Sequence, residues 1–349
     1  MIERINASPA RVLAIDLPSG VDASTGEVAT VAVQANVTVT FHGPKVGLVV
    51  APGRFHAGIV HVADIGLDQI ETEHKLVRPD VLRAVPRRGE RDNKYTSGHV
   101  LVVGGSPGLT GAPSLSALAA LRADAGYVTV AAPESTLPVF ELRLLEAVKR
   151  PLPEKDGLVA AGAAERVLEL AQKASSVALG PGLGRGPGPQ QLVRRLLAEL
   201  ELPVVVDADA LFELEPGDWP APRVLTPHEG ELGRLLGRSS QEISAHRIAS
   251  VREAAERFSC VVLLKGPDTL VAAPGRGLLV SALGLPSLAT AGTGDVLTGI
   301  VAAFLAKGME PQLAAASAAA AQQRAAVEAP QRAGLVAGDL VDALPRVLL

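Results

Sequence analysis

The sequence predicts an α/β fold in which a mostly parallel β-sheet is covered by helices on both faces. Short, continuous apolar runs such as Val100–Val103 and Val177–Leu179 are each followed by a segment with helical periodicity. Continuous apolar strands are typical of a sheet that is buried on both sides. Aromatic residues make up only 3% of the 349 residues. The core therefore has to be built from Leu, Val and Ala, which favours layered packing of helices on a sheet.

The character of the chain changes near residue 78. Before it stand short β-rich runs separated by Gly and Pro, at residues 12–15, 37–40, 47–50 and 59–62. Between Arg78 and Ser97 come two prolines and a dense cluster of charge, which are typical of a linker or domain-entry segment. We expect one domain over residues 1–77 and a second over 78–349. A surface loop inside a single domain is the alternative.

From His99 onward, strand-like and helix-like segments alternate. We expect strands at residues 100–103, 128–130, 177–179, 204–206, 224–225, 261–264 and 270–272. We expect helices at about residues 112–123, 159–172, 190–200 and 241–257, then after Gly294, after Pro311 and near Asp339. In open sheets of this kind, ligands bind beyond the carboxyl ends of the strands. Functional residues should therefore follow strands.

Composition and charge exclude several classes of protein. The net charge is −4 and no basic patch stands out, which argues against a nucleic-acid partner. The single cysteine, Cys260, lies in an apolar run and excludes an intrachain disulfide framework. No secretory signal is recognisable at Met1–Asn6. The apolar stretch 288–306 carries Asp295 and three glycines, which indicates a buried helix and not a membrane span. These features predict a soluble, cytoplasmic protein with no membrane partner.

The segment Ala291–Asp295, which reads Ala-Gly-Thr-Gly-Asp, is the sharpest functional signal. Its glycines, Gly292 and Gly294, let the backbone approach a ligand closely. The helix expected here presents unpaired N–H groups and the positive end of its dipole to an anion. Asp295 at this edge can take a proton from a substrate hydroxyl, although an Asp that only caps the helix is the structural alternative. Thr293, the glycines and the long apolar helix favour a phosphate site with a catalytic base.

A second polar segment follows the expected strand at 261–264. It consists of Lys265, Gly266, Pro267, Asp268 and Thr269. A lysine at a strand end can neutralise phosphate, and the residues after it can hold a nucleotide. The alternative is an ordinary β-turn, because Gly-Pro-Asp is turn-prone. Because the Gly-Thr-Gly-Asp segment follows further along the chain, we consider nucleotide binding at least as probable as an ordinary turn.

Three more segments follow expected strands. Gly180–Gly184 allows close backbone contact with a ligand, but it lacks both the Walker A ending and the dinucleotide fingerprint. The acidic pair Asp207 and Asp209 could serve Mg²⁺ through water, as could Glu231, while His228 could hydrogen-bond substrate. The alternative is a structural turn for the glycine loop and the acidic pair, and a satisfied structural residue for His228.

Taken in order, these motifs resemble those of the NAD(P)H-hydrate dehydratases, a branch of the ribokinase-like fold. The matching segments are Asn93-Lys94, Gly98-His99, Thr110–Pro113, Gly180–Gly184, Asp207–Leu211, Thr226–Glu231, Lys265–Thr269 and Ala291–Asp295. The resemblance covers about residues 78–349 and implies a three-layer sandwich. It implies that the substrate is held by Ala112, Gly182, Gly184, His228 and Asp295. It further implies that the nucleotide is bound by Lys265, Gly266, Pro267, Asp268, Thr269, Gly292, Thr293 and Gly294.

Residues 1–77 resemble the end of a second family, the NAD(P)H-hydrate epimerases. The match is carried by Ala14–Asp22 and Thr40–Gly47. It implies an incomplete α/β remnant in which Asp16 would touch substrate and Ser19 would help to bind K⁺. The nucleotide-binding front of that family and its other K⁺ ligands have no counterpart. We expect either a truncated sequence, as from a misassigned start, or a remnant, and no epimerase activity.

The resemblance implies repair of NADH and NADPH that are hydrated at C6 of the nicotinamide ring. Such an enzyme would dehydrate the S epimer with ADP (ATP in eukaryotes) and Mg²⁺, releasing AMP and phosphate. Asp295 would be the base, and a phosphorylated hydroxyl would be the transient intermediate. Relatives usually assemble, so we expect a homo-oligomer. The alternatives are an ATP-dependent kinase of a small hydroxylated metabolite, which leaves a stable phosphorylated product, and a non-catalytic nucleotide sensor.

One position departs from the family pattern. Asp124 stands in the segment Arg122–Gly126 where the family usually has glycine. If that position needs a positive φ, Asp is tolerated less well than Gly. We expect an effect on local stability and not on the chemistry.

Overall fold

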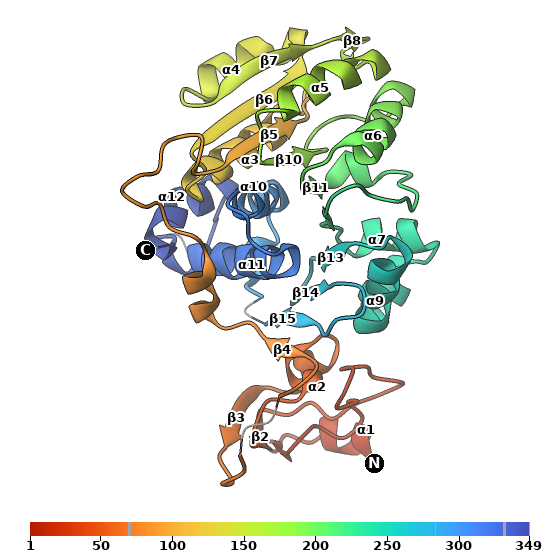
Figure 1. Ribbon diagram of the computed structural model, residues 1–349. Helices are drawn as coiled ribbons and strands as arrows, with labels where there is room; N and C mark the ends of the chain where they lie inside the picture. Colours follow the sequence, from red (N-terminus) through yellow and green to blue (C-terminus); the bar gives the residue numbers. More distant parts are fainter. Residues whose placement is uncertain (69–70, 283, 331–332, 349) are drawn as a thin grey trace.

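The main body of the protein is a sandwich around one large, mostly parallel sheet (Figure 1). The computed structural model describes residues 1–68, 71–282, 284–330 and 333–348. The ten strands lie in the order β4-β15-β14-β13-β12-β11-β10-β5-β6-β7, and only the pairs β13–β14 and β14–β15 are antiparallel. Their bounds are β4 Lys75–Leu76, β5 His99–Val103, β6 Tyr127–Pro133, β7 Val148–Leu152, β10 Ser176–Leu179, β11 Val204–Val206, β12 Arg223–Leu225, β13 Val261–Leu264, β14 Thr269–Ala272 and β15 Leu279–Ser281. The predicted α/β class is confirmed.

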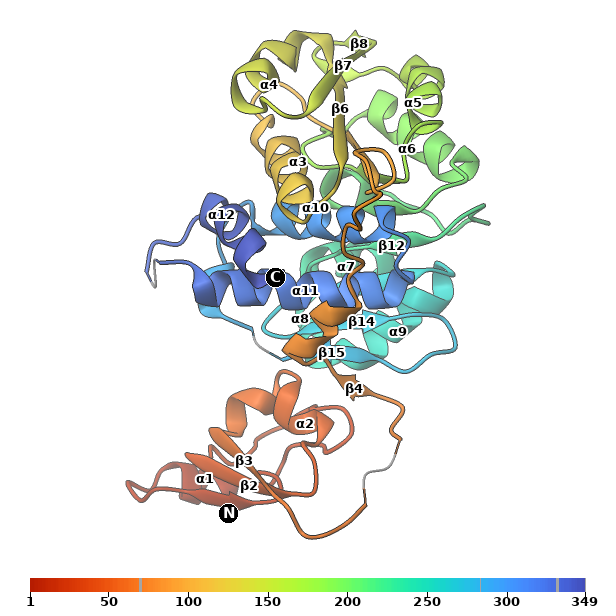
Figure 2. The same ribbon diagram turned by 60° about the vertical axis from the view of Figure 1, so that its left-hand side comes forward.

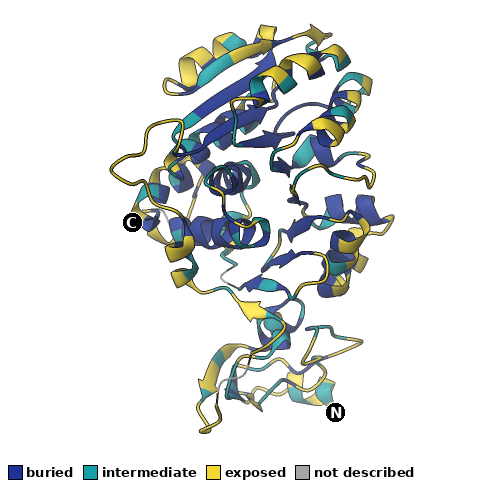
Figure 3. Cartoon of the chain, in the orientation of Figure 1, coloured by how far each residue is buried: buried dark blue, intermediate teal, exposed yellow. Residues whose placement is uncertain are grey.

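Helices cover both faces of this sheet. One face packs against α3 (Gly111–Arg122), α4 (Leu137–Arg143), α10 (Thr293–Ala306), α11 (Pro311–Glu328) and α12 (Ala337–Val347). The other face packs against α5 (Ala164–Ala171), α6 (Pro187–Glu199), α7 (Glu229–Leu236), α8 (Ser240–Ala245) and α9 (Arg247–Arg257). Side chains alternate along β5, so that Val100 and Val102 enter the first core and Leu101 and Val103 the second. The inner strands β5, β10, β11, β12 and β13 are accordingly buried between two layers of helices (Figure 3).

Short elements connect these layers. A two-stranded hairpin is formed by β8 (Glu154–Lys155) and β9 (Leu158–Val159). Short 3₁₀ helices occur at Pro79–Ala84, Glu134–Thr136, Ala161–Ala163, Ala208–Leu211 and Pro286–Leu288. None of the helices in the described part of the chain is long and apolar enough to cross a membrane.

Small residues set the position of α10. A Cβ atom on Gly299 would lie 2.2 Å from the carbonyl oxygen of Ser116 on α3, so only glycine allows the two helices to approach this closely. The Ser116 hydroxyl in turn donates a 2.9 Å hydrogen bond to the carbonyl oxygen of Asp295. The packing of α3 on α10 thereby fixes the segment that carries the predicted base.

The N-terminal residues form a separate small unit below the main body (Figure 2). Its parallel sheet has the order β1 (Leu13–Ile15), β2 (Val37–Phe41) and β3 (Ile59–Ala63). Around it lie α1 (Ile2–Asn6), α2 (Val46–Val49) and the 3₁₀ helix η1 (Gly53–His56). The strand β4, just before the expected boundary at residue 78, pairs with β15 of the large sheet.

Three expected elements differ from the structure. Residues 47–50 were expected as a strand, but Val46–Val49 form a helical turn, because Gly47 packs directly against the backbone of Asp22. The expected helix over 159–172 begins only at Ala164, since residues 158–159 pair in the β8–β9 hairpin. The expected helix over 241–257 is interrupted at His246, whose backbone leaves the helical region between α8 and α9.

Asp124 does occupy the left-handed region, with φ of +69°. Its carboxylate compensates by pairing with Arg88 Nε at 2.7 Å and with the buried Lys307 Nζ at 2.6 Å. Aspartate is among the few non-glycine residues that visit this conformation. The local cost in backbone energy is therefore offset by two ion pairs that glycine could not make.

Candidate active site

The predicted functional segments meet at one edge of the large sheet. The strands β10, β11, β12 and β13 are parallel neighbours, so the residues after them emerge on the same side. These residues are Gly180, Asp207, Thr226 and Lys265. The first turns of α10 lie against them, because Thr298 donates a 2.7 Å hydrogen bond to Asp207. Segments that are far apart in sequence thus surround one place.

Asp207 and Lys265 form an ion pair at the centre of this edge. Lys265 Nζ lies 2.9 Å from Asp207 Oδ1, and the Thr298 hydroxyl holds Asp207 Oδ2. Burial raises the pKa of Asp207, but the charge of Lys265 and the hydrogen bonds from Thr298 and Lys265 outweigh it, so the pKa is lowered. Burial lowers the pKa of Lys265, but Asp207 and Glu231 outweigh this and the pKa is raised. Both groups are therefore charged at neutral pH.

The start of α10 has free N–H donors. Gly292 is the N-cap residue in the left-handed region, with φ of +88°, and no side chain caps the helix. Among the described residues, the backbone N–H groups of Gly294 and Asp295 have no hydrogen-bond acceptor. A Cβ atom on Gly294 would lie 3.4 Å from Lys265 Nζ, which places the ammonium group beside these donors. This arrangement suits an anion.

Asp295 is the third residue of α10 and does not act as its cap. In the described part of the chain, its carboxylate receives no hydrogen bond. Burial, followed by the negative charge of Asp207, raises the pKa of Asp295 to about 7, against the lowering effect of Lys265. A carboxyl group with that pKa is suited to accept a proton near neutral pH. The capping alternative is therefore not what the structure contains.

The Gly180–Gly184 loop is shaped by close backbone packing. Gly180, Gly182 and Gly184 all have positive φ, and a Cβ atom on Gly182 would lie 2.3 Å from the carbonyl oxygen of Leu109. Gly184 N donates a 2.9 Å hydrogen bond to Asp209, which also pairs with Arg185. Asp209 thus stabilises the loop. The predicted contact of Gly182 and Gly184 with substrate stays a prediction.

His228 and Glu231 form a capping box at the start of α7. The Nδ1 atom of His228 accepts from the backbone of Gly230 and Glu231, and Glu231 accepts a 2.9 Å hydrogen bond from His228 N. Glu231 Oε2 also lies 3.9 Å from Lys265 Nζ. Both side chains therefore have structural roles beside the site, and their predicted roles toward substrate and Mg²⁺ stay predictions.

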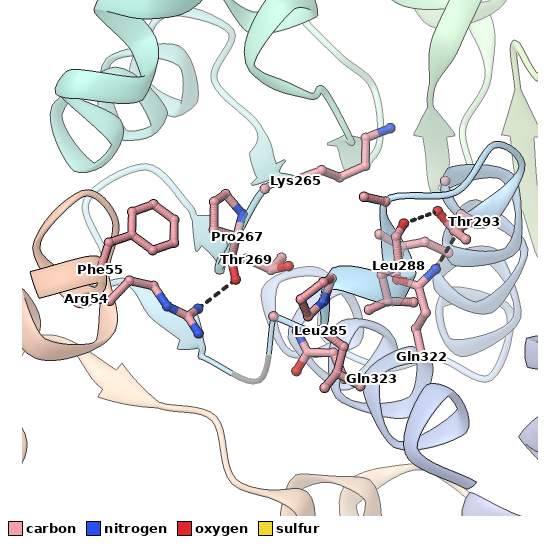
Figure 4. Close-up of a pocket in the computed structure, with 16 residues that line it drawn as sticks. Arg54, Phe55, Lys265, Pro267, Thr269, Leu285, Leu288, Thr293, Gln322 and Gln323 are labelled. Atoms are coloured by element: carbon pink, nitrogen blue, oxygen red, sulfur yellow. Dashed lines mark hydrogen bonds between the residues drawn. The ribbon is translucent and has the colours of Figure 1, made fainter. Parts of the chain in front are cut away.

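A cavity of about 480 Å³ adjoins the ion pair and the start of α10 (Figure 4). Its lining residues from the predicted segments are Lys265, Gly266, Pro267, Thr269, Thr293 and Gly294. Asp268 is not among the lining residues, because its side chain is fully buried and accepts hydrogen bonds from Ala51 N and Arg247. A second cavity, of about 400 Å³, shares Lys265 and Gly266 with the first and is also lined by His228.

The cavity also includes four polar or aromatic side chains that the sequence did not suggest. Gln322 and Gln323 reach it from α11, and Arg54 and Phe55 reach it from η1 of the N-terminal unit. The adjacent glutamines interrupt an Ala-rich helix, which is a signal that could have drawn attention to them. No comparable pattern surrounds Arg54 and Phe55.

Several predicted residues are not part of this cavity's wall. Gly292 and Asp295 lie next to its lining residues Thr293 and Gly294 in the chain but do not line it themselves. Ala112 is the second residue of α3, one turn before Leu115, whose side chain packs under Gly292. Asp16 accepts 2.8 Å hydrogen bonds from Thr40 and Lys45, and the hydrogen bond with Lys45 is the main cause of its lowered pKa. Ser19 is exposed. Asp16 and Ser19 follow β1 in the N-terminal unit and do not join the site described above.

Two known protein families match this chain, one in each of its two parts. Residues 100–346 match the family model described as NAD(P)H-hydrate dehydratase, and residues 1–47 match the one described as YjeF-related protein N-terminus. A bifunctional NAD(P)H-hydrate repair enzyme from Moorella thermoacetica is 42% identical, over 100% of this chain and 68% of its own. Another from Salinibacter ruber is 39% identical, over 99% and 67%. The chain thus spans about two thirds of the length of these relatives.

Solved structures show the same fold. An ADP/ATP-dependent NAD(P)H-hydrate dehydratase from Bacillus subtilis, co-crystallized with ATP/Mg²⁺, has a TM-score of 0.68 and 30% identity, covering 77% of this chain and 96% of that one. A ribokinase-like superfamily protein from Enterococcus faecalis has a TM-score of 0.69 and 22% identity, covering 81% and 98%. The second likeness shows the ribokinase-like fold alone. Since the dehydratase model spans most of the chain, the protein belongs to the NAD(P)H-hydrate dehydratase family, with a YjeF-related segment at its N-terminus.

Proposed function

We propose that this chain dehydrates the S epimer of hydrated NADH and NADPH, using ADP and releasing AMP and phosphate. The observation that carries the proposal is Asp295, whose pKa is raised to about 7 beside unpaired N–H donors and Lys265. A base and an anion site in contact are what a hydroxyl-to-phosphate transfer requires. The names of the relatives support the substrate class.

In the proposed reaction, Asp295 accepts the proton of the C6 hydroxyl group. The resulting oxygen attacks the terminal phosphoryl group of ADP, so that a C–O–P linkage forms and AMP leaves. The N–H groups of Gly294 and Asp295, together with Lys265, hold the oxygens of the transferred group. The ring nitrogen then expels phosphate, and loss of a proton from the neighbouring carbon restores the dihydropyridine.

Mg²⁺ would be held mainly by the nucleotide. No group of three or more His, Cys, Asp or Glu side chains suited to a metal occurs in the described ranges. Mg²⁺ commonly uses one or two carboxylates and the phosphates of its substrate. Both oxygens of Asp207 are already engaged, so Glu231, acting through water, fits this role better. Bound Mg²⁺ would share the charge of the phosphate oxygens.

The proposal does not include epimerase activity. The carboxylate of Asp16 is paired with Lys45 and Thr40. Ser19, which is exposed, is the single residue predicted to help bind K⁺. We expect the purified chain, incubated with the R epimer and no nucleotide, to leave the epimer ratio unchanged. Interconversion of the two epimers would contradict this part of the proposal.

The direct test is incubation with NADH hydrate, Mg²⁺ and either ADP or ATP. We expect free phosphate to appear in step with the absorbance of reduced nicotinamide, faster with ADP than with ATP. Omitting the nucleotide is the control. A stable phosphorylated product would indicate a kinase of the same fold instead. Nucleotide binding without release of phosphate would indicate a sensor.

A further inference from the structure

The N-terminal unit is attached to the main body at the predicted nucleotide segment. Ala51 N donates a 2.8 Å hydrogen bond to Asp268 Oδ1, and Arg54 donates a 2.6 Å hydrogen bond to the carbonyl oxygen of Pro267. Asp268 is fully buried and is held on its other side by Arg247, which donates to its carboxylate and to its carbonyl oxygen. Asp268 is therefore held by hydrogen bonds from the N-terminal unit and from the main body.

The attachment places η1 over the cavity. Gly53 at its start is held by a 2.8 Å hydrogen bond to the carbonyl oxygen of Gly26, and a Cβ atom there would lie 2.4 Å from Gly47 O. The turn is thus closely packed within the N-terminal unit. Its next two residues, Arg54 and Phe55, line the cavity together with residues of the main body.

Phe55 stands out by its exposure. Its side chain is 60% exposed, whereas Phe140, Phe258 and Phe304 are buried in the cores of the main body. Figure 4 shows Phe55 and Arg54 on the left of the cavity and Thr293, at the start of α10, on the right. The cavity therefore extends from Thr293 toward Pro267 and Phe55, which gives room for a nucleotide whose phosphates lie on α10.

We propose that the N-terminal unit completes the nucleotide site. Phe55 provides an aromatic surface on which the base of the nucleotide stacks, and Arg54 is a positioning residue that fixes the Pro267 carbonyl group. This inference rests on the proposed function, because it assumes that the cavity takes ADP. It gives the N-terminal unit a role in the dehydratase reaction that needs no epimerase chemistry.

The test is calorimetric titration of the full chain with ADP, for the wild type and Phe55→Ala. Stacking of a base on an aromatic ring leads us to expect about tenfold weaker ADP binding in the variant. The Michaelis constant for ADP should rise by a similar factor while kcat stays the same. Phe55→Trp should bind as tightly as the wild type. Arg54→Ala should weaken ADP binding less, because it removes only the support of Pro267.

The matched control is Ile59→Ala. Ile59 is an exposed apolar residue of the same unit, at 64% exposure, and does not line the cavity. It should bind ADP like the wild type, and thermal melting should show all variants folded. Phe55→Ala with unchanged ADP affinity would overturn the inference. If the wild type still released phosphate from NADH hydrate in that case, the proposed function would stand without it.

Discussion

Asp295 owes its properties to three neighbours and to burial. The negative charge of Asp207 raises its pKa, and Lys265, which is paired with Asp207, lowers it. Thr298, one turn further along α10, holds the other oxygen of Asp207. The ion pair of Asp207 and Lys265 therefore adjusts the pKa of the base. Two experiments follow from this arrangement.

The first is the pH dependence of Asp207→Asn. The wild-type rate should rise with pH through about 7, because Asp295 must be ionised to accept a proton. Replacing Asp207 removes a repelling charge and releases Lys265, so the pKa of Asp295 should fall by about one unit. Measured profiles of kcat/KM should therefore show the rising limb at lower pH in the variant. A limb that stays in place, or moves to higher pH, would exclude Asp207 as the residue that adjusts Asp295.

The second concerns stability. The pKa of Asp295 is raised in the folded state. The contribution of Asp295 to stability is therefore fully present at pH values below its pKa in the unfolded chain, and it is lost as the pH rises through about 7. Asp295→Asn removes this loss and should raise the free energy of unfolding at pH 8 by roughly 1–3 kcal/mol. The gain should be smaller at pH 5. Urea denaturation at both pH values measures it, and an equal gain at both would count against the raised pKa.

The sequence alone could propose Lys265 and the Gly180–Gly184 loop, because they follow expected strands, and Asp295, because it stands in a glycine-rich segment at the start of an expected helix. It could not identify Arg54 and Phe55, because they reach the cavity through contacts with residues more than 200 positions away, as between Arg54 and Pro267. The sequence also could not show that Asp268 has a different place from Lys265, Gly266, Pro267 and Thr269, with which it was predicted to bind the nucleotide. Only the folded chain shows that this carboxylate joins the two units and does not line the cavity.

At the scale of elements, the site depends on the contact of α3 with α10. Gly299→Ala would place a methyl group 2.2 Å from Ser116 O, so the helices must separate. We expect a loss of about 1–3 kcal/mol in the free energy of unfolding, as for other overpacked cores. Activity should fall as well, because α10 carries Asp295. Gly338→Ala on α12 is the control, since nothing lies near its added Cβ atom. Equal melting temperatures for the two variants would refute this role for the helix contact.

Periodicity predicted the elements that repeat the strand-then-helix order. The buried strands 100–103, 204–206 and 261–264 appear nearly as expected, because continuous apolar runs specify them. The break at His246 and the antiparallel pairing of β14 with β13 and β15 were not indicated by the hydrophobic pattern. The same is true of the interval 47–50, where the neighbouring backbone decides the conformation.

At the scale of the whole molecule, the two units share buried surface. Val50 is fully buried and belongs to the same core cluster as the strands and helices of one face of the main body. Further contacts join His246 with Glu27 at 2.9 Å, and Arg252 with Glu73. We therefore expect the units to unfold together.

Val50→Ala tests this cooperation. Removing a fully buried part of a valine side chain should cost about 2 kcal/mol. Trp219, the only tryptophan, lies in the main body, so its fluorescence reports unfolding there. The urea midpoint seen by Trp219 should fall in Val50→Ala and stay unchanged in Val62→Ala, whose side chain is 48% exposed. An unchanged Trp219 transition in Val50→Ala would mean that the units unfold independently.

The central claim is that Asp295 starts a dehydration that passes through a phosphorylated hydroxyl group. The measurement is the rate of phosphate release from NADH hydrate and ADP by the wild type and Asp295→Asn, with ADP affinity determined in parallel. We predict that the variant loses turnover by about 10²-fold or more and still binds ADP, because only the base is removed. Near-normal turnover in Asp295→Asn would contradict the claim.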